Sequence, residues 1–120
     1  MIACNMMITI AIEAMAEAVV LTEANGLPRQ TFFELILGTL FGSRSYEVYS
    51  RQIREETYVP GFKASLGLKD LRLASEAAEA AGRQLPMLDA VRGQMTRTIE
   101  AGLGERDWSI MADVTIRGGG

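Results

Sequence analysis

The first 25 residues constrain the fold of this chain most strongly, because they contain neither glycine nor proline and are mostly apolar. Ile8, Ile12, Met15 and Val19 recur at the spacing of one helix face. Other apolar residues cover most of the remaining surface of such a helix, and a helix that is apolar nearly all round packs on several sides. The sequence therefore predicts a long first helix, buried within an all-α protein.

The same stretch has the length of a membrane span or a signal peptide, but its residues favour neither. Glu13 and Glu17 lie inside it, and charge at the centre of a bilayer is costly. It carries neither a basic leader nor a clear cleavage pattern. We therefore expect a core helix in a cytoplasmic protein with no membrane contact. The two carboxylates repel each other mildly at this spacing, and we interpret them as a solvated edge.

Glycine and proline divide the rest of the chain into shorter helices, with a Pro-Gly loop around residue 60. No segment has the sustained alternation of a strand. We expect a single helical domain over residues 1–116 and a disordered tail over residues 117–120. The expected shorter helices cover residues 28–37, 45–54, 66–81 and 86 to about 101, followed by a short last helix with Asp107 as its N-cap.

Composition excludes several classes of function. The 12 Lys and Arg residues do not cluster and the net charge is -3, which argues against a nucleic-acid partner. The chain has no His, so neither a Ser-His-Asp nor a Cys-His site can form, and we predict no metal site. The single cysteine, Cys4, is expected to be a buried thiol. The chain also has no glycine-rich nucleotide fingerprint of its own.

Three polar residues remain as candidates for a site. Asn5 is a poor helix former in an apolar helix and needs hydrogen-bond partners, which water, a neighbouring loop or a ligand could supply. Lys69 and Asp70 lie near the start of the expected fourth helix, where the helix dipole favours an acidic side chain. From spacing alone, a surface charge pair is the simpler interpretation of these two residues.

Several segments, taken together in order and spacing, resemble the C-terminal helical domain of the 3-hydroxyisobutyrate dehydrogenase-like, or β-hydroxyacid dehydrogenase, family. The resemblance implies the fold of the 6-phosphogluconate dehydrogenase C-terminal domain. It also implies an enzyme in which a separate Rossmann domain binds NAD or NADP. Hydride then passes between nicotinamide and a short β-hydroxyacid or semialdehyde. The resembling segments are residues 2–7, 13–18, 61–62, 68–74, 85–86 and 107–109.

The resemblance also implies roles for individual residues. The family places a catalytic lysine four residues before a substrate-binding asparagine, and here Asn5 matches the asparagine while Met1 holds the lysine position. A thioether cannot exchange a proton, so no catalytic residue is assigned. Phe62, Lys69 and Asp70 match positions near the cofactor, most of which the family binds through the Rossmann domain.

Two functions follow from this combination. The chain is half of an oxidoreductase site, inactive alone because the Rossmann domain and the lysine are missing. The alternative is a non-catalytic helical dimerisation or interaction module. The first helix carries more apolar surface than five short neighbours can cover, which predicts a partner surface and, by resemblance, a homodimer.

Overall fold

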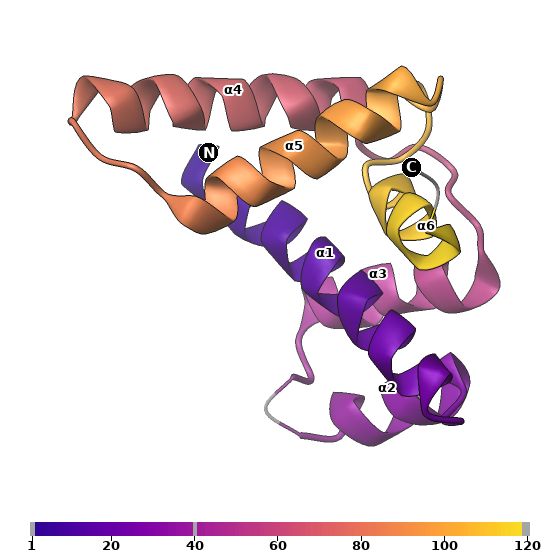
Figure 1. Cartoon of the computed structure of the whole chain (residues 1–120). Coiled ribbons are helices and arrows are strands. Elements are labelled where there is room, and N and C mark those ends of the chain that lie inside the picture. Colours follow the sequence, from indigo (N-terminus) through magenta and orange to yellow (C-terminus); the bar gives the residue numbers. More distant parts are fainter. Residues whose placement is uncertain (1, 40, 119–120) are drawn as a thin grey trace.

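The computed structural model describes residues 2–39 and 41–118, and in these residues the chain forms six helices and no strand (Figure 1). The prediction of one all-α domain with a long first helix is confirmed. Met1, which the resemblance matches to a catalytic lysine, lies outside the described residues. The helices are α1 (Ile2–Ala24), α2 (Arg29–Leu37), α3 (Arg44–Glu55), α4 (Ala64–Ala80), α5 (Pro86–Glu100) and α6 (Ile110–Arg117).

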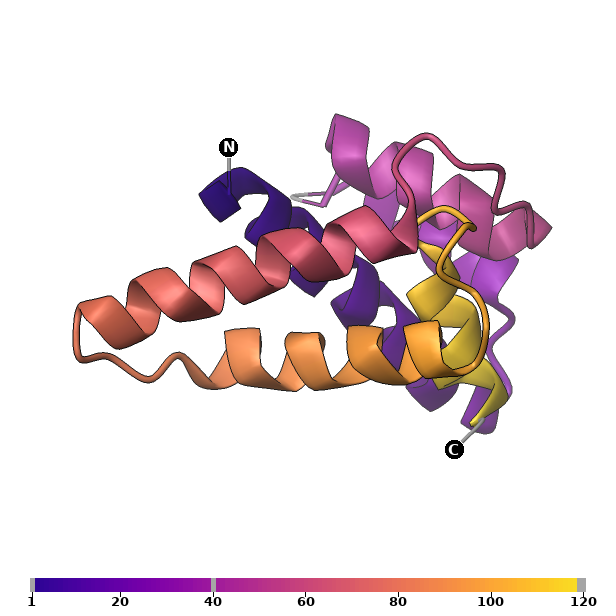
Figure 2. The ribbon, with the colours of Figure 1, turned by 90° about the horizontal axis from the view of Figure 1, so that it is seen from above.

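Helix α1 runs through the middle of the domain and contacts each of the other five helices. The antiparallel helices α4 and α5 lie across its first half, and α2 and α3 pack near its other end (Figures 1 and 2). Ile12, Ala16 and Val19 have no exposed surface. Although α1 is long and apolar enough to cross a membrane, this packing is that of a core helix.

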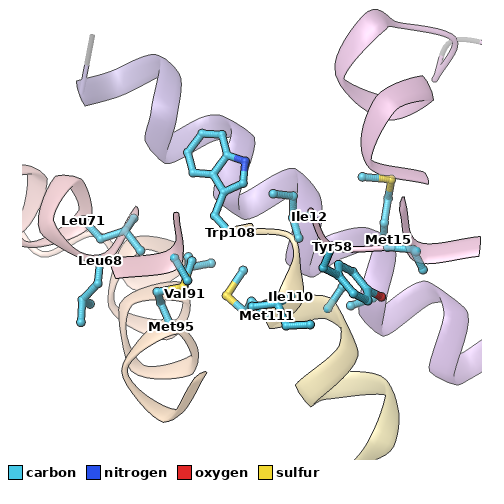
Figure 3. Packing of buried hydrophobic residues seen from close by; sticks show 14 of the residues in the cluster. Ile12, Met15, Tyr58, Leu68, Leu71, Val91, Met95, Trp108, Ile110 and Met111 are labelled. Atoms are coloured by element: carbon cyan, nitrogen blue, oxygen red, sulfur yellow. The ribbon is translucent and has the colours of Figure 1, made fainter. Parts of the chain in front are cut away.

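The core joins two groups of side chains through the segment that leads into α6. Leu68 and Leu71 of α4 gather with residues of α5 on one side, and Met15 and Tyr58 lie on the other (Figure 3). Trp108 lies between them, and Gly67 of α4 packs against it, since a Cβ at this position would lie 3.4 Å from the indole, an ordinary contact distance. The apolar face of each helix thus turns toward α1 or Trp108.

The start of the last helix differs from the prediction. Helix α6 begins at Ile110, and Asp107 is not its N-cap. The Asp107 side chain is buried and binds the preceding loop instead: Oδ1 accepts hydrogen bonds from the backbone N–H groups of Gly61 and Phe62, both at 3.0 Å. Its Oδ2 accepts from the backbone and hydroxyl of Ser109. Asp107 therefore joins the loop before α4 to the turn before α6.

The domain boundary expected at residue 116 also lies later. Arg117 is the last residue of α6, where its Nε donates to Asp113 at 2.7 Å. Gly118 then ends the helix with a φ of 67°, a conformation that glycine adopts without strain. Arg117 thus belongs to the helix and not to a tail, because an ion pair one turn back supports the last turn. The rest of the predicted tail, residues 119–120, lies outside the described residues.

Two expectations about α1 were wrong. Cys4 is exposed, because at the start of the helix the side that carries Asn5 turns toward α4 and Cys4 does not. Glu13 is buried and not part of a solvated edge. Its carboxylate accepts from the Thr115 hydroxyl of α6 at 2.8 Å, and Gln94 of α5 donates to the same hydroxyl. The pKa of Glu13 is raised to about 7, mainly by burial; the hydrogen bond from Thr115 lowers it and the nearby Glu17 raises it.

We predict that replacing Asp107 destabilises the domain. Asp107→Ala leaves three backbone N–H groups without their acceptor, and a buried unsatisfied donor costs about 1–3 kcal/mol. The loop can relax and expose some of these groups to water, which reduces the total cost. The free energy of unfolding, measured by urea titration, should therefore fall by about 3 kcal/mol. Ser109→Ala removes only one hydroxyl and serves as the control, with a loss of about 1 kcal/mol. Equal losses in the two variants would contradict this role of Asp107.

We also predict that stability falls as pH rises from about 4.5 to about 7, the interval between the usual and the raised pKa of Glu13. Below this interval Glu13 is protonated in both states, whereas above it the folded protein must bury a charge. A shift of one pKa unit corresponds to about 1.4 kcal/mol of stability. Because solvent reaches the edge of the Glu13 carboxyl, we expect a total loss of unfolding free energy of about 2 kcal/mol across the interval. Urea unfolding at several pH values measures this loss of unfolding free energy.

The neutral variant Glu13→Gln should lose most of this pH dependence and exceed the wild type in stability at pH 8. Glu76→Gln removes a carboxylate from an exposed position on α4, so its pH dependence should match that of the wild type. A Glu13→Gln variant with the wild-type pH dependence would assign the effect to another group.

Candidate functional site

Two of the residues selected from the sequence meet directly. Asn5, in the first turns of α1, donates a hydrogen bond from Nδ2 to Oδ2 of Asp70 on α4, at 2.7 Å. They are 65 residues apart in the chain and come together because α1 packs against α4. Both side chains are half-buried, so each keeps an edge that a ligand can reach. We call them the Asn5–Asp70 pair.

Neighbouring side chains hold both halves of the Asn5–Asp70 pair in place. On α1, the buried Thr9 hydroxyl donates to the carbonyl oxygen of Asn5 at 2.6 Å, one turn back. On α4, Leu68 and Leu71 are buried in the core on either side of Asp70 in the sequence. The core contacts of the two helices therefore set the separation of the polar pair at its edge.

Lys69 does not join the Asn5–Asp70 pair. It is exposed, and it forms no hydrogen bond or ion pair with other residues that the structure describes. Leu68 and Leu71 are buried, so Lys69 lies on the solvent side of this turn of α4. The structure thus places an uncommitted ammonium group next in sequence to Asp70.

Phe62 is half-buried and belongs to the edge of the core. Its ring lies against Trp108 with a centroid separation of 4.4 Å, and its backbone N–H donates to Asp107. The indole Nε1 of Trp108 donates in turn to the hydroxyl of Tyr49. The position of Phe62 is therefore set by the loop that leads into α4, two residues before that helix begins.

A polar stripe on α1 escaped the reading of the sequence. Asn5, Thr9, Glu13 and Glu17 follow each other at four-residue intervals, which places them along one face of the helix. Thr9 and Glu13 are both buried. From the sequence, only Glu13 and Glu17 were linked by this spacing, and the stripe extends it to Asn5 and Thr9. Within the described residues, no three His, Cys, Asp or Glu side chains lie close enough together to hold a metal ion.

The second half of α1 borders two hollows away from the Asn5–Asp70 pair. One is an apolar cavity of about 220 Å³, which α1 forms with α2, α3 and the segment between them. The other is a more open hollow of about 510 Å³ on the side of α6. Both include Ala18, and the exposed Val20 and Leu21 line the second. The cavity is lined by Ala14, Met15, Ala18, Phe32, Ile36, Phe41 and Tyr46.

Comparison with known proteins identifies the family. Residues 2–115 match the family model described as NAD-binding of NADP-dependent 3-hydroxyisobutyrate dehydrogenase. The match covers almost the whole chain, so the chain belongs to this family of NAD(P)-dependent β-hydroxyacid dehydrogenases. The predicted recognition is therefore confirmed, and the six helices are those of the family's C-terminal helical domain.

Individual relatives agree with this assignment. The chain is 36% identical over 111 residues to an uncharacterised oxidoreductase, YfjR, of Bacillus subtilis, a match that covers 92% of this chain and 38% of that protein. It is 31% identical over 114 residues to the NAD-dependent L-serine dehydrogenase of Pseudomonas aeruginosa, covering 89% of the chain and 38% of the relative. The chain thus spans less than half the length of these relatives.

Solved structures have the same fold. A 3-hydroxyisobutyrate dehydrogenase from Salmonella typhimurium superposes with a TM-score of 0.86 at 24% identity, over 94% of this chain and 40% of that chain. The Mycobacterium tuberculosis 3-hydroxyisobutyrate dehydrogenase crystallised with L-serine gives 0.82 at 26% identity, over 94% of this chain and 41% of that one.

Proposed function

We propose that this domain forms the substrate side of an NAD(P)-dependent hydride-transfer site, which a Rossmann domain completes. The substrate is a short β-hydroxyacid or the corresponding semialdehyde. The observation that carries the proposal is the hydrogen bond between Asn5 and Asp70. It brings together the asparagine that matches the family's substrate ligand and a residue that matches its cofactor side. Two helices that are far apart in the sequence thus contribute to one binding site.

The residues of this chain divide the work of binding. Asn5 holds the substrate, while Phe62, Lys69 and Asp70 lie toward the cofactor. The uncommitted ammonium of Lys69 suits a ribose hydroxyl or a phosphate. NAD or NADP, when bound, supplies the nicotinamide ring that accepts or delivers the hydride. The choice between the two rests with the Rossmann domain, which contacts the 2′ position of the adenosine ribose.

Proton transfer needs a group that the 120-residue chain does not supply at the family's position. As the substrate hydroxyl becomes a carbonyl, its proton must pass to a base, and the family uses a lysine where this chain has Met1. A thioether cannot accept that proton. We therefore expect no turnover from the 120-residue chain on its own. Separately, we expect the protein to be soluble and to act in the cytoplasm.

We predict that a lysine at position 1 supports catalysis when a Rossmann domain is present. The test joins the amino-terminal part of the Pseudomonas L-serine dehydrogenase to residues 1–120, so that this chain supplies position 1. General acid/base catalysis contributes about 10²–10⁴-fold. NAD reduction with L-serine or 3-hydroxypropionate should therefore be faster by that factor in the Met1→Lys chimera than in the unchanged one. Equal rates would refute the interpretation of Met1.

Asn5→Ala in the Met1→Lys chimera is the control, and it should raise KM. A chimera that binds NAD but is inactive with either residue at position 1 would overturn the proposed function.

A second role, as a dimerisation module, is favoured by the apolar surface on the second half of α1. On α1, Leu21 is 67% exposed and Val20 is 43% exposed, and Leu35 on the neighbouring α2 is 67% exposed. The apolar cavity and the open hollow lie on the same part of α1. Exposed apolar side chains beside such hollows favour an interaction site. A second copy of the chain is the partner that the family resemblance implies.

We predict a dimer that depends on this surface. Size-exclusion chromatography with light scattering should give twice the mass of the chain, 26 kDa on the basis of 13.1 kDa per copy. Leu21→Lys places a charge on the surface and should shift the species toward monomer. Lys69→Gln, at an exposed position on α4, should leave the mass unchanged. A wild-type monomer at high concentration would contradict the prediction.

A further inference from the structure

The hydrogen bond to Asp70 determines which end of the Asn5 carboxamide remains for a ligand. An ionised carboxylate only accepts hydrogen bonds, so the nitrogen of Asn5, and not its oxygen, must face Asp70. The reversed amide would bring two oxygens together at 2.7 Å and would be repulsive. The Asn5 carbonyl oxygen therefore lies at the end of the amide opposite Asp70.

The groups that the Asn5–Asp70 pair leaves open are mostly acceptors. They are the Asn5 oxygen and the second Asp70 oxygen, against one remaining N–H of the Asn5 amide. Asp70 also contributes a negative charge that half-burial screens less than full exposure would. A ligand carboxylate placed here would meet acceptors and a like charge, whereas a hydroxyl or an ammonium would meet partners.

We infer that Asp70 is a positioning residue: by fixing the Asn5 amide, it makes this place select the hydrogen-bond-donating end of the substrate, a hydroxyl or an ammonium, and not its carboxylate. This inference rests on the proposed function. The carboxylate end of the same substrate is then bound elsewhere, by the Rossmann domain. The site thereby orients a hydroxyacid with its reacting carbon at α1.

The packing keeps this orientation in the absence of ligand. Thr9 holds the backbone of Asn5, and Leu68 and Leu71 hold the turn of α4 that carries Asp70. The amide therefore does not need to be reordered when a ligand arrives, and preorganised polar groups bind without that entropic cost. The preference for a hydrogen-bond-donating ligand group therefore follows from the fold of this domain.

Three three-carbon acids that differ only at the third carbon test the inference: 3-hydroxypropionate, 3-aminopropionate and 3-fluoropropionate. Fluorine is close to hydroxyl in size but donates no hydrogen bond. The full 120-residue chain is titrated with each acid while the side-chain N–H resonances of Asn5 are followed by NMR. We expect the hydroxyl and ammonium ligands to bind about tenfold more tightly than the fluoro ligand, or better, because a hydrogen bond to a charged or well-placed group has that effect.

Asp70→Asn separates positioning from simple structure. An amide at position 70 can face Asn5 with either end, so Asn5 can turn, and the preference for donor ligands should fall below about threefold. Glu76→Gln removes the same charge from an exposed position on α4 and should keep the tenfold preference. If Asp70→Asn does not fold, the titration of the unmodified chain with the three acids still tests the inference.

Two results would overturn the inference. One is a fluoro ligand that binds as well as the hydroxyl ligand, and the other is a chain that binds none of the three acids. The chimera with a Rossmann domain tests the proposed function separately. An active chimera without discrimination would refute only the inference, whereas an inactive one that binds NAD would refute the function.

Discussion

The contact of α1 with all five of the other helices is the constraint on which the rest of this domain depends. A mostly apolar helix of 23 residues needs partners on several sides, and the other helices bury the face of α1 that holds Ile12, Met15 and Val19. Its first half meets α4 and α5, and its second half meets α2 and α3 (Figure 1). Polar groups on the packed side of this helix need hydrogen-bond partners inside the protein, and Asn5 and Glu13 find theirs on other helices.

The polar stripe of α1 illustrates this rule at two places. Near the start of the helix, Asn5 meets Asp70 of α4 at the edge of the core, where a ligand can reach both. Two turns later, Glu13 meets Thr115 of α6 in a buried position, and its pKa rises accordingly. The first contact is suited to binding and the second links α1 to α6. Depth of burial distinguishes them, since both use a hydrogen bond between distant helices.

The loop before α4 connects the core to the candidate site. Asp107 fixes the backbone at Gly61 and Phe62, and Trp108 packs against the Phe62 ring. From there α4 carries Lys69 and Asp70 to their positions along its axis. The buried carboxylate of Asp107 thereby helps to fix the start of the helix that carries these two residues. Gly67 of α4 also packs against Trp108 in this segment.

Local patterns in the sequence determined the helical class, the length of α1, the opening of α5 at Pro86, and the choice of Asn5, Lys69 and Asp70 as candidates. These depend on residue spacing and on resemblance, which need no knowledge of distant contacts. Only the tertiary structure decided that Asn5 bonds Asp70 while Lys69 faces solvent, that Glu13 is buried, that Cys4 is exposed, and that Asp107 binds a loop and does not cap α6. Each of these depends on which helix covers which side of another, and a polar side chain shows in the sequence that it needs a partner but not where that partner lies.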